Sequence, residues 1–422
     1  MKVFKFGGAS VKDAKSVRNV FKVLDHFRKD DLVIVVSAMG KTTNALEEIL
    51  LSYLNSSPNL SNQITELRDF HFDIVKELFP DAEHRIYNEV EIALTQLEIS
   101  TQSELEDDYN RLYDKIVPFG EIISTKIISA YLEDQGYTNE WLDARKLVRT
   151  DKNYRFARVD WEQTIGLISD RVKAGNNYLV QGFIGADADH ESTTLGREGS
   201  DYTASIFAYS LNAEEVIIWK DVPGILNGDP KVFKDTELLH QLSFREAIEL
   251  AYYGASVIHP KTIQPLRKKG IPLFVRSFLN PKDSGTRVGN GLDLDPFLPC
   301  FIRKENQALI TISTKDLAFI VEDHLSMIYK IFHEFGVRVN MSQNTAVSSS
   351  FCINNDPVIC PKILKALKSE FVTSFNTDAN LFTVRHYDEK SKQIVKESGK
   401  VLLEQISRNS NKSLIFLSYK TR

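Results

Sequence analysis

A short segment near the start of the chain joins a lysine to two consecutive glycines. In Lys5-Phe6-Gly7-Gly8-Ala9-Ser10 the lysine lies at the end of an apolar run, and the glycines directly precede a helical pattern. Glycines let the backbone approach a ligand closely, and the free N–H groups of a helix N-terminus attract anions. The segment therefore predicts a site for phosphate or another anion. A tight turn beside a surface lysine is the alternative.

The densest polar segment of the sequence covers residues 193–203 and reads TTLGREGSDYT. Within it, Arg197 carries a two-pronged set of donors that suits a carboxylate or a phosphate. Ser200 and Asp201 also fit a purely structural role, because both residue types favour the start of a helix and a helical pattern begins near Asp201. The segment predicts a binding loop for an anionic ligand, with helix capping left open for the last two residues.

Two further loops follow an apolar run that ends at Trp219. They read Lys220-Asp221-Val222-Pro223-Gly224 and Gly228-Asp229-Pro230-Lys231, and they fit either a nucleotide site or an ordinary surface loop. The segment Met39-Gly40-Lys41-Thr42 is not a Walker loop, because that motif needs a glycine where Val35 stands. A nucleotide site in this chain is thus predicted to use lysines and glycine turns that differ from a Walker loop.

The composition excludes several classes of protein. The 422 residues carry 57 acidic and 52 basic side chains, a net charge of −5, which disfavours a dedicated nucleic-acid binder. The three cysteines, Cys300, Cys352 and Cys360, show neither a disulfide framework nor zinc-ligand spacing. Apolar runs such as Leu32–Val36 are far shorter than the roughly 20 residues of a membrane helix. We expect a cytoplasmic protein that is not embedded in a membrane and whose side chains form no metal site.

The polar segments follow short apolar runs that alternate with helical patterns. The segment 43–131 is mostly helical in pattern, and an earlier helix is indicated by apolar residues at helical spacing from Val17 to Phe27. Alternation of this kind predicts an α/β fold with a mostly parallel sheet between helices, and ligands bind at the carboxyl ends of such strands. The predicted strands are Val3–Phe6, Leu32–Val36, Tyr178–Ile184 and Val216–Trp219.

Prolines interrupt the chain near Pro296, just after a glycine-rich stretch, which predicts two domains, 1–295 and 296–422. The second predicts a β-α-β-β-α-β order, the ferredoxin-like α+β pattern of small regulatory modules. Its predicted elements are strands at Ala308–Ser313, Val337–Met341, Ala346–Ile353 and Phe371–Phe375, and helices at Ile320–Phe335 and Pro361–Glu370. The rest of the tail, with strands predicted at Asn380–His386, Lys400–Gln405 and Leu414–Ser418, is too short for a full second copy.

Taken in order, these segments resemble aspartate kinase of the amino-acid kinase superfamily. The resemblance is carried by Lys5–Ser10, by residues 36–44 (VSAMGKTTN), by Gly120-Glu121, by residues 193–204 and by the loops after Trp219, and it covers roughly residues 1–288. The tail resembles the ACT-type regulatory region of the same enzymes more loosely. The resemblance implies transfer of the γ-phosphoryl group of ATP to the side-chain carboxylate of L-aspartate, at the entry to lysine, threonine and methionine synthesis.

The resemblance also assigns roles to individual residues. It implies that Lys5 stabilises the transferring phosphoryl group and that Asp201 organises the site, both as catalytic residues. Mg²⁺ is expected on the phosphates of ATP, without a protein ligand. The implied aspartate-binding residues are Ser37, Thr43, Glu121, Arg197 and Ser200. The implied nucleotide-binding residues are Lys5, Gly7, Gly8, Ser10, Lys220, Asp221 and Lys231. The implied effector residues are Ser313 and Asn340, with lysine or threonine as the effector and the absence of any effector left open. A homodimer or larger homo-oligomer is expected through the ACT-type region.

The chain departs from the family pattern at a few positions. Ser256 stands where a lysine is common, which removes a cation expected near the nucleotide, and Glu198 replaces a glycine, with a side chain expected to point away from the substrate. Asn340 stands where lysine-sensitive members often carry an aspartate. Two other functions therefore stay open: a catalytically weak amino-acid sensor, and a kinase for another amino-acid carboxylate such as glutamate. Helix capping remains an alternative role for Thr43, as does a first-turn helix charge for Glu121.

Overall fold

The computed structural model describes residues 1–102, 108–255, 258–316, 318–397, 399–407 and 413–419. The chain divides into two compact units. Unit 1 consists of Met1–Ile225, Leu238–Ile248 and Val257–Pro296, and unit 2 of Leu226–Glu237, Glu249–Ser256 and Phe297–Arg422. Two short segments that precede residue 296 in the sequence thus belong to unit 2. None of the helices among the described residues is both long and apolar enough to cross a membrane.

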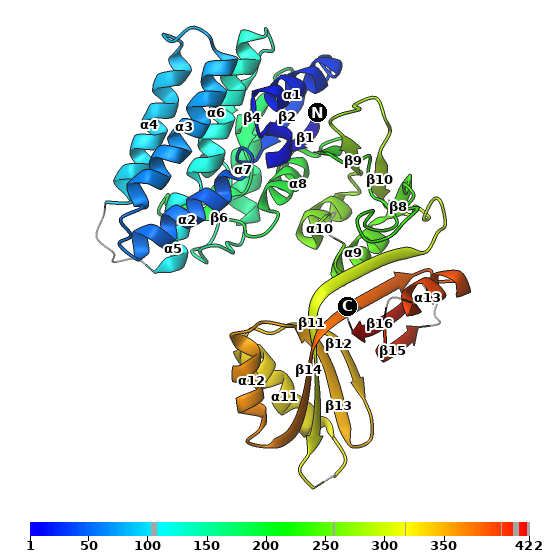
Figure 1. The fold of residues 1–422 in the computed structure, drawn as a ribbon. Coiled ribbons are helices and arrows are strands. Elements are labelled where there is room, and N and C mark those ends of the chain that lie inside the picture. The colour runs from blue at the N-terminus through cyan, green and yellow to red at the C-terminus, as the bar shows by residue number, and fades with distance from the viewer. Residues whose placement is uncertain (103–107, 256–257, 317, 398, 408–412, 420–422) are drawn as a thin grey trace. The chain divides into compact units, whose positions relative to one another are not determined.

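Unit 1 is built on an eight-stranded sheet with helices packed on it (Figure 1). All neighbouring strands are parallel except β9 and β10, which are antiparallel. The predicted α/β sheet is confirmed. The strands, in their order across the sheet, are β3 (Glu140–Leu142), β4 (Tyr178–Gln181), β2 (Leu32–Val36), β1 (Lys2–Phe6), β7 (Val216–Lys220), β9 (Leu273–Ser277), β10 (Thr286–Gly289) and β8 (Gln241–Ser243).

The central strands are short, apolar and buried on both faces, as expected of a parallel sheet covered by helices. All five residues of β2 are buried, and β1 pairs with β2 and β7, so these three strands end side by side. The predicted strand Tyr178–Ile184 is wrong in its extent: β4 ends at Gln181, and a separate hairpin of β5 (Ile184–Ala186) and β6 (Ser192–Thr194) begins after a turn. The carboxyl ends of β1, β2, β4 and β7 therefore form one edge of unit 1.

Helices make up most of the segment between β2 and β3, as the sequence predicts. The helices of unit 1 are η1 (Gly8–Val11), α1 (Ala14–His26), α2 (Thr42–Leu54), α3 (Leu60–Leu78), α4 (Arg85–Ser100), α5 (Tyr109–Ile116), α6 (Phe119–Asp134), η2 (Ala144–Lys146), α7 (Trp161–Arg171), α8 (Gly199–Leu211) and α10 (Pro260–Lys269). Helix α9 (Phe244–Tyr253) has residues in both units.

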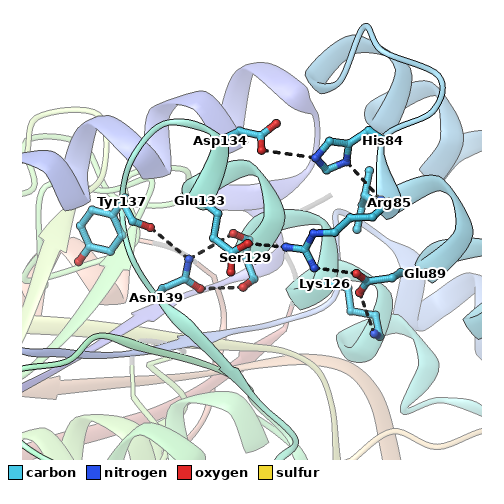
Figure 2. Close-up of polar contacts among 10 residues, drawn as sticks. His84, Arg85, Glu89, Lys126, Ser129, Glu133, Asp134, Tyr137 and Asn139 are labelled. Carbon is cyan, nitrogen blue, oxygen red and sulfur yellow. Dashed lines mark hydrogen bonds and ion pairs between the residues drawn. The ribbon is translucent and has the colours of Figure 1, made fainter.

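Polar contacts connect the start of α4 to the end of α6 (Figure 2). His84 caps α4 by accepting from the N–H of Ile86 through Nδ1, so its Nε2 is the nitrogen that donates to Asp134, at 3.4 Å. Arg85 bonds to Glu133 at the same end. Exposed ion pairs of this kind contribute little stability. They join α4 to the end of α6 that lies opposite Glu121, a predicted site residue.

Unit 2 contains a six-stranded antiparallel sheet. Its strands, in order across the sheet, are β12 (Val339–Asn344), β13 (Ser348–Asn354), β11 (Cys300–Thr314), β14 (Phe371–Arg385), β16 (Ser413–Tyr419) and β15 (Val401–Ser407). Its helices are α11 (Glu322–Glu334), α12 (Ile359–Leu367) and α13 (Glu389–Lys396), the last of which the sequence analysis missed. The predicted strands Ala308–Ser313 and Phe371–Phe375 are parts of two much longer strands, β11 and β14, of 15 residues each.

These two long strands make unit 2 a pair of interleaved halves. The register of β11 against β14 shifts between Lys304 and Gln307. On one side of this shift the sheet packs α11 and α12 over a core that includes Phe332 and Phe351. On the other side, the first residues of β11 and the end of β14 join α13, β15 and β16 around Phe382 and other residues. The β-α-β-β-α-β order is confirmed for the first half, and the tail forms a second half with one helix.

Candidate functional site

A cavity of about 560 Å³ lies in unit 1 at the edge where the parallel strands end. It collects residues that are far apart in the sequence. The predicted residues that line it are Lys5, Ser37, Thr43, Glu121, Arg197, Ser200, Asp201 and Lys220. The remaining lining residues are Glu47, Tyr113, Arg155, Phe156, Phe183, Gly196, Glu198 and Gly199. Every predicted aspartate-binding residue and both predicted catalytic residues thus surround one space.

Lys5 and Asp201 form an ion pair in this cavity. The ammonium of Lys5, near the end of β1, lies 2.8 Å from Oδ1 of Asp201, in the first turn of α8. The two side chains are 12% and 5% exposed. An ion pair that is largely removed from water has a strong field and a fixed geometry. Asp201 therefore holds the lysine ammonium at the cavity wall, where it can act on an incoming anion.

The glycine turn after β1 packs against the loop that follows β2. A Cβ at Gly8 would lie 2.8 Å from the carbonyl oxygen of Gly40 and 3.0 Å from that of Ala38, closer than real side chains approach. The N–H of Gly40 donates to the carbonyl oxygen of Gly8 at 3.1 Å. The two loops thus require glycine at position 8. Gly7 caps η1, and Ser10 is buried within it; neither of them nor Gly8 lines the cavity.

Glu121 is a buried acid at the start of α6, only 3% exposed. Its Oε1 accepts from the N–H of Ala38 at 3.3 Å, and among the described residues no group donates to Oε2. Burial raises the pKa of Glu121 to about 8, with only small opposing effects from the Ala38 N–H and from the charge of Lys5. The residue lies in the first turn of α6 and also lines the cavity, so its position is compatible with both roles considered for it, a first-turn helix charge and substrate binding.

Thr43 lies inside the first turn of α2, whose N-cap is Lys41, and it lines the cavity. The capping role considered for it is therefore wrong. Its neighbour Thr42 is turned into the core, where its hydroxyl lies 3.5 Å from Nε2 of His71. Ser37 follows β2, and its N–H donates to the carbonyl oxygen of Phe6 at 3.1 Å. Ser37 and Thr43 both line the cavity, as Glu121 does.

The loop before α8 carries Arg197 and Glu198. Arg197 is exposed, and no hydrogen bond or ion pair of its guanidinium occurs within the described ranges. Glu198 adopts a left-handed backbone conformation with φ of 55°, which costs energy for a residue other than glycine. Burial, followed by the charge of Asp201, raises the pKa of Glu198. The expectation that Glu198 points away is wrong, because its side chain lines the cavity.

The predicted nucleotide-binding residues are less concentrated. Lys220 ends β7 and lines the cavity, whereas Asp221 follows it on the surface. Lys231 is exposed and belongs to unit 2, where its N–H donates to Oδ1 of Asp229 at 2.9 Å. Ser256, the departure from the family lysine, lies outside the described residues. Within unit 1, Lys5 and Lys220 are therefore the two predicted lysines that face the cavity.

The sequence analysis missed an acidic and aromatic part of the cavity wall. The hydroxyl of Tyr113 on α5 donates to Oε1 of Glu47 on α2 at 2.8 Å. Burial, together with this hydrogen bond, raises the pKa of Tyr113. Arg155 and Phe156 enter from a turn before α7. No motif or spacing links these residues, since each comes from a separate segment with ordinary composition, so only tertiary structure could identify them.

The predicted effector residues of unit 2 do not come together within the chain. Asn340 is next to Val339, which pairs with Ile353 of β13, and Ile353 pairs with Ala308 of β11. Ser313 lies five residues further along β11, roughly 17 Å away along the strand. The two residues therefore occupy different ends of the first half of the sheet.

Asn340 is already engaged in a polar cluster of unit 2. Its Oδ1 accepts from the ammonium of Lys304 at 3.1 Å, and its Nδ2 donates to Oε1 of Gln307 at 2.8 Å and to Oδ1 of Asn354 at 2.9 Å. Burial, and then the nearby charge of Arg338, lower the pKa of Lys304. A lysine of the chain itself thus occupies the acceptor oxygen of Asn340.

The cavity gathers lysine, arginine and acidic side chains at the edge of the parallel sheet where β1, β2, β4 and β7 end, and comparison with known proteins identifies the family. The amino acid kinase family matches residues 1–277, and the chain belongs to this family. Within the family it groups with the aspartokinases. It is 33% identical to Aspartokinase 1, chloroplastic, of Arabidopsis thaliana, over 83% of this chain and 63% of that protein. It is 30% identical to Lysine-sensitive aspartokinase 3 of Escherichia coli, over 83% of this chain and 78% of that protein.

Solved structures of E. coli aspartokinase III share the whole architecture. The structure in complex with aspartate and ADP, described as the R-state, superposes with a TM-score of 0.83 at 26% identity and covers 99% of this chain and 96% of the other. The structure in complex with lysine and aspartate, described as the T-state, gives a TM-score of 0.82 at 27% identity with the same coverage. The likeness covers both the parallel sheet and the antiparallel regulatory region.

Proposed function

We propose that this protein transfers the γ-phosphoryl group of ATP to the side-chain carboxylate of L-aspartate, producing 4-phospho-L-aspartate and ADP. The observation that carries the proposal is the buried Lys5–Asp201 pair in a cavity that also contains Arg197 and Glu121. Relatives that bind aspartate and ADP with the same fold support it. An acid, an arginine and a lysine complement the ammonium and the two carboxylates of aspartate.

The reaction asks for positioning and charge stabilisation more than for proton transfer. A carboxylate oxygen of aspartate attacks the γ-phosphorus, a new P–O bond forms, and the bond to the β–γ bridging oxygen breaks as ADP leaves. The attacking carboxylate is already ionised at neutral pH, so no general base is required. Lys5 stabilises the negative charge on the transferring group, and Asp201 keeps the Lys5 ammonium at the required position. The buried surroundings of this pair strengthen its field.

The remaining cavity residues hold the acceptor. Arg197 is proposed to bind the α-carboxylate, and Glu121 the α-ammonium. Because Glu121 is buried, a cation is its natural partner: pairing offsets the cost of burying the charge. Ser37, Thr43 and Ser200 are proposed to supply hydrogen bonds to the substrate. Binding and orientation by such groups account for a large part of the rate enhancement of kinases.

The nucleotide is proposed to lie on the side of Lys220, with the glycine turn of Gly7, Gly8 and Ser10 near its phosphates and Asp221 completing the site. Lys231, which lies in unit 2, stays a prediction from the family resemblance. Magnesium prefers phosphate and carboxylate oxygens. We propose that the phosphates of ATP hold the ion, as the family resemblance implies, in a cavity that the carboxylates of Glu198 and Asp201 also line. When bound, the ion supplies charge neutralisation on the phosphates.

Regulation and assembly complete the proposal. We propose a cytoplasmic homo-oligomer whose catalytic domain ends near residue 295 and whose ACT-type region, 296–422, responds to an end product of the pathway. The ammonium of Lys304 on Asn340 disfavours a second cation at that residue, because like charges repel. This argues for testing threonine beside lysine, with Ser313 and Asn340 as the positions to vary.

The test is formation of an acyl phosphate, trapped with hydroxylamine, in the presence of ATP, Mg²⁺ and aspartate or glutamate. We expect product with aspartate. Lys5→Ala should lower kcat at least 100-fold and leave aspartate binding largely intact, since the ammonium acts on the transition state. Product with glutamate alone would favour the other kinase. Aspartate binding without any product would favour the sensor and overturn the proposal.

A further inference from the structure

Arg155 is an arginine of the cavity wall to which neither the fold nor the predicted site gives a role. Its guanidinium lies over the rings of Tyr113, at 4.6 Å, and of Tyr109, at 5.1 Å from the ring centres. In the described part of the chain no oxygen accepts a hydrogen bond from this guanidinium. Aromatic faces hold an arginine by attraction to its charge while leaving its N–H donors available. The donors of Arg155 are therefore available for a ligand in the cavity.

The backbone of Arg155 is held in place by a buried acid. Asp114 is fully buried, and its Oδ2 accepts from the N–H of Arg155 at 2.9 Å and from the N–H of Thr194 at 2.8 Å. The hydroxyl of Thr194 donates to Oδ1 at 2.6 Å. One carboxylate thus joins the turn of Arg155 to the strand that leads into Arg197. This fixes the backbone position of Arg155 relative to the strand that precedes Arg197.

The conformation of Arg155 is itself costly. Its φ is 68°, in the left-handed region that residues other than glycine rarely adopt. Such strain persists where the surrounding structure determines the conformation, and it is concentrated at functional sites. Here the hydrogen bond from the N–H of Arg155 to Asp114 supports the turn in this conformation.

Arg155 lines the same cavity as Glu121 and Arg197. Arg155 lies over the ring of Tyr113, and its charge and that of Glu121 both act on Tyr113. Arg197 acts on Glu198, which lines the cavity as well. The cavity thus holds two arginines and a buried acid, which complement the α-carboxylate and the α-ammonium of an amino acid.

From this arrangement we propose that Arg155 binds the α-carboxylate of the acceptor amino acid, as a second arginine beside Arg197, and so helps to set the specificity for an α-amino acid. The inference rests on the proposed function and adds a residue to it. Arg155 would contact the substrate directly, whereas Asp114 acts through Arg155 as a positioning residue. The stacked arrangement limits the motion of the guanidinium, so little entropy is lost on binding.

The test compares Arg155→Ala and Arg155→Lys with Arg158→Ala, a matched control that removes an exposed arginine three residues away. For Arg155→Ala we expect KM for aspartate to rise about 10- to 100-fold, the value of one charge-assisted contact, with KM for ATP unchanged. Arg155→Lys should recover part of this loss, because it restores the charge without the fork. Arg158→Ala should behave as wild type.

A second arm identifies the group that Arg155 contacts. Binding of aspartate and of its α-carboxamide analogue, isoasparagine, is measured by calorimetry for wild type and Arg155→Ala. We expect the substitution to weaken aspartate and to leave isoasparagine unchanged, since the analogue lacks the charged partner. Equal weakening of both ligands, or loss of ATP affinity as well, would indicate a structural role and overturn the inference. An unchanged KM for aspartate would overturn it as well. Absence of aspartate binding and turnover in wild type would instead overturn the proposed function.

Discussion

Release of a proton on substrate binding is the most direct consequence of the environment of Glu121. Burial raises the pKa of this carboxyl from 4.5 to about 8 in the ligand-free cavity. The rise corresponds to about 5 kcal/mol, the cost of placing the charged form there without a partner. The α-ammonium of aspartate is the proposed partner, and it favours the ionised carboxylate. Binding at neutral pH should therefore drive a proton from Glu121 into the solvent.

The size of the effect follows from the pKa. With a pKa of about 8, the free carboxyl is about 0.9 protonated at pH 7 and about 0.2 protonated at pH 8.5. Calorimetric titration with aspartate in buffers of different ionisation enthalpy reports the number of protons released. We expect about 0.9 at pH 7 and about 0.2 at pH 8.5 for wild type. Glu121→Gln should release none, and Glu48→Gln, an exposed carboxyl of α2, should match wild type.

The same carboxyl gives an independent signature in the ligand-free protein. Its pKa is raised on folding, so its contribution to stability is fully present below about 4.5 and is lost as pH rises through about 8. Relative to wild type, Glu121→Gln should therefore gain stability between pH 5 and pH 8.5 in chemical denaturation. A wild-type proton release near zero at pH 7, or an identical pH dependence of wild type and Glu121→Gln, would refute the reasoning.

Two further substitutions test how the cavity is built. Gly8→Ala should cost about 1–3 kcal/mol of stability and raise KM for ATP, because its Cβ would meet the carbonyl oxygens of Gly40 and Ala38. Gly166→Ala, with open space around it in α7, should instead stabilise the protein by about 0.5–1 kcal/mol. Thermal melting compares the two variants. Asp114→Asn should cost about 1–3 kcal/mol of stability and raise KM for aspartate, since it weakens the hydrogen bonds to Thr194 and Arg155. An unchanged KM for aspartate in this variant would argue against the positioning role of Asp114.

The sequence predicted the main strands of unit 1 and half of the residues that line the cavity. Short apolar runs such as Leu32–Val36, alternating with helical patterns, predict buried strands of a parallel sheet, and the carboxyl ends of parallel strands share one edge. Lys5 and Lys220, near the ends of two such strands, and Ser37, directly after a third, were therefore predictable as neighbours, and the resemblance to a family added Glu121 and the role of Arg197. All five line the cavity. The sequence analysis was less successful where a strand ended in a turn, as at Gly182, since periodicity does not locate such ends.

Only the tertiary structure decided which distant side chains meet. Tyr113, Glu47 and Arg155 come from separate segments, and nothing in the local sequence relates them; the hydrogen bonds of Asp114 and the packing of α2 against α5 bring them together. The direction of Glu198 likewise depends on a left-handed backbone residue that sequence patterns do not reveal. Local sequence determines periodicity and turns, whereas contacts between distant segments depend on how the whole chain packs, so the sequence specified the sheet edge and the fold completed the cavity.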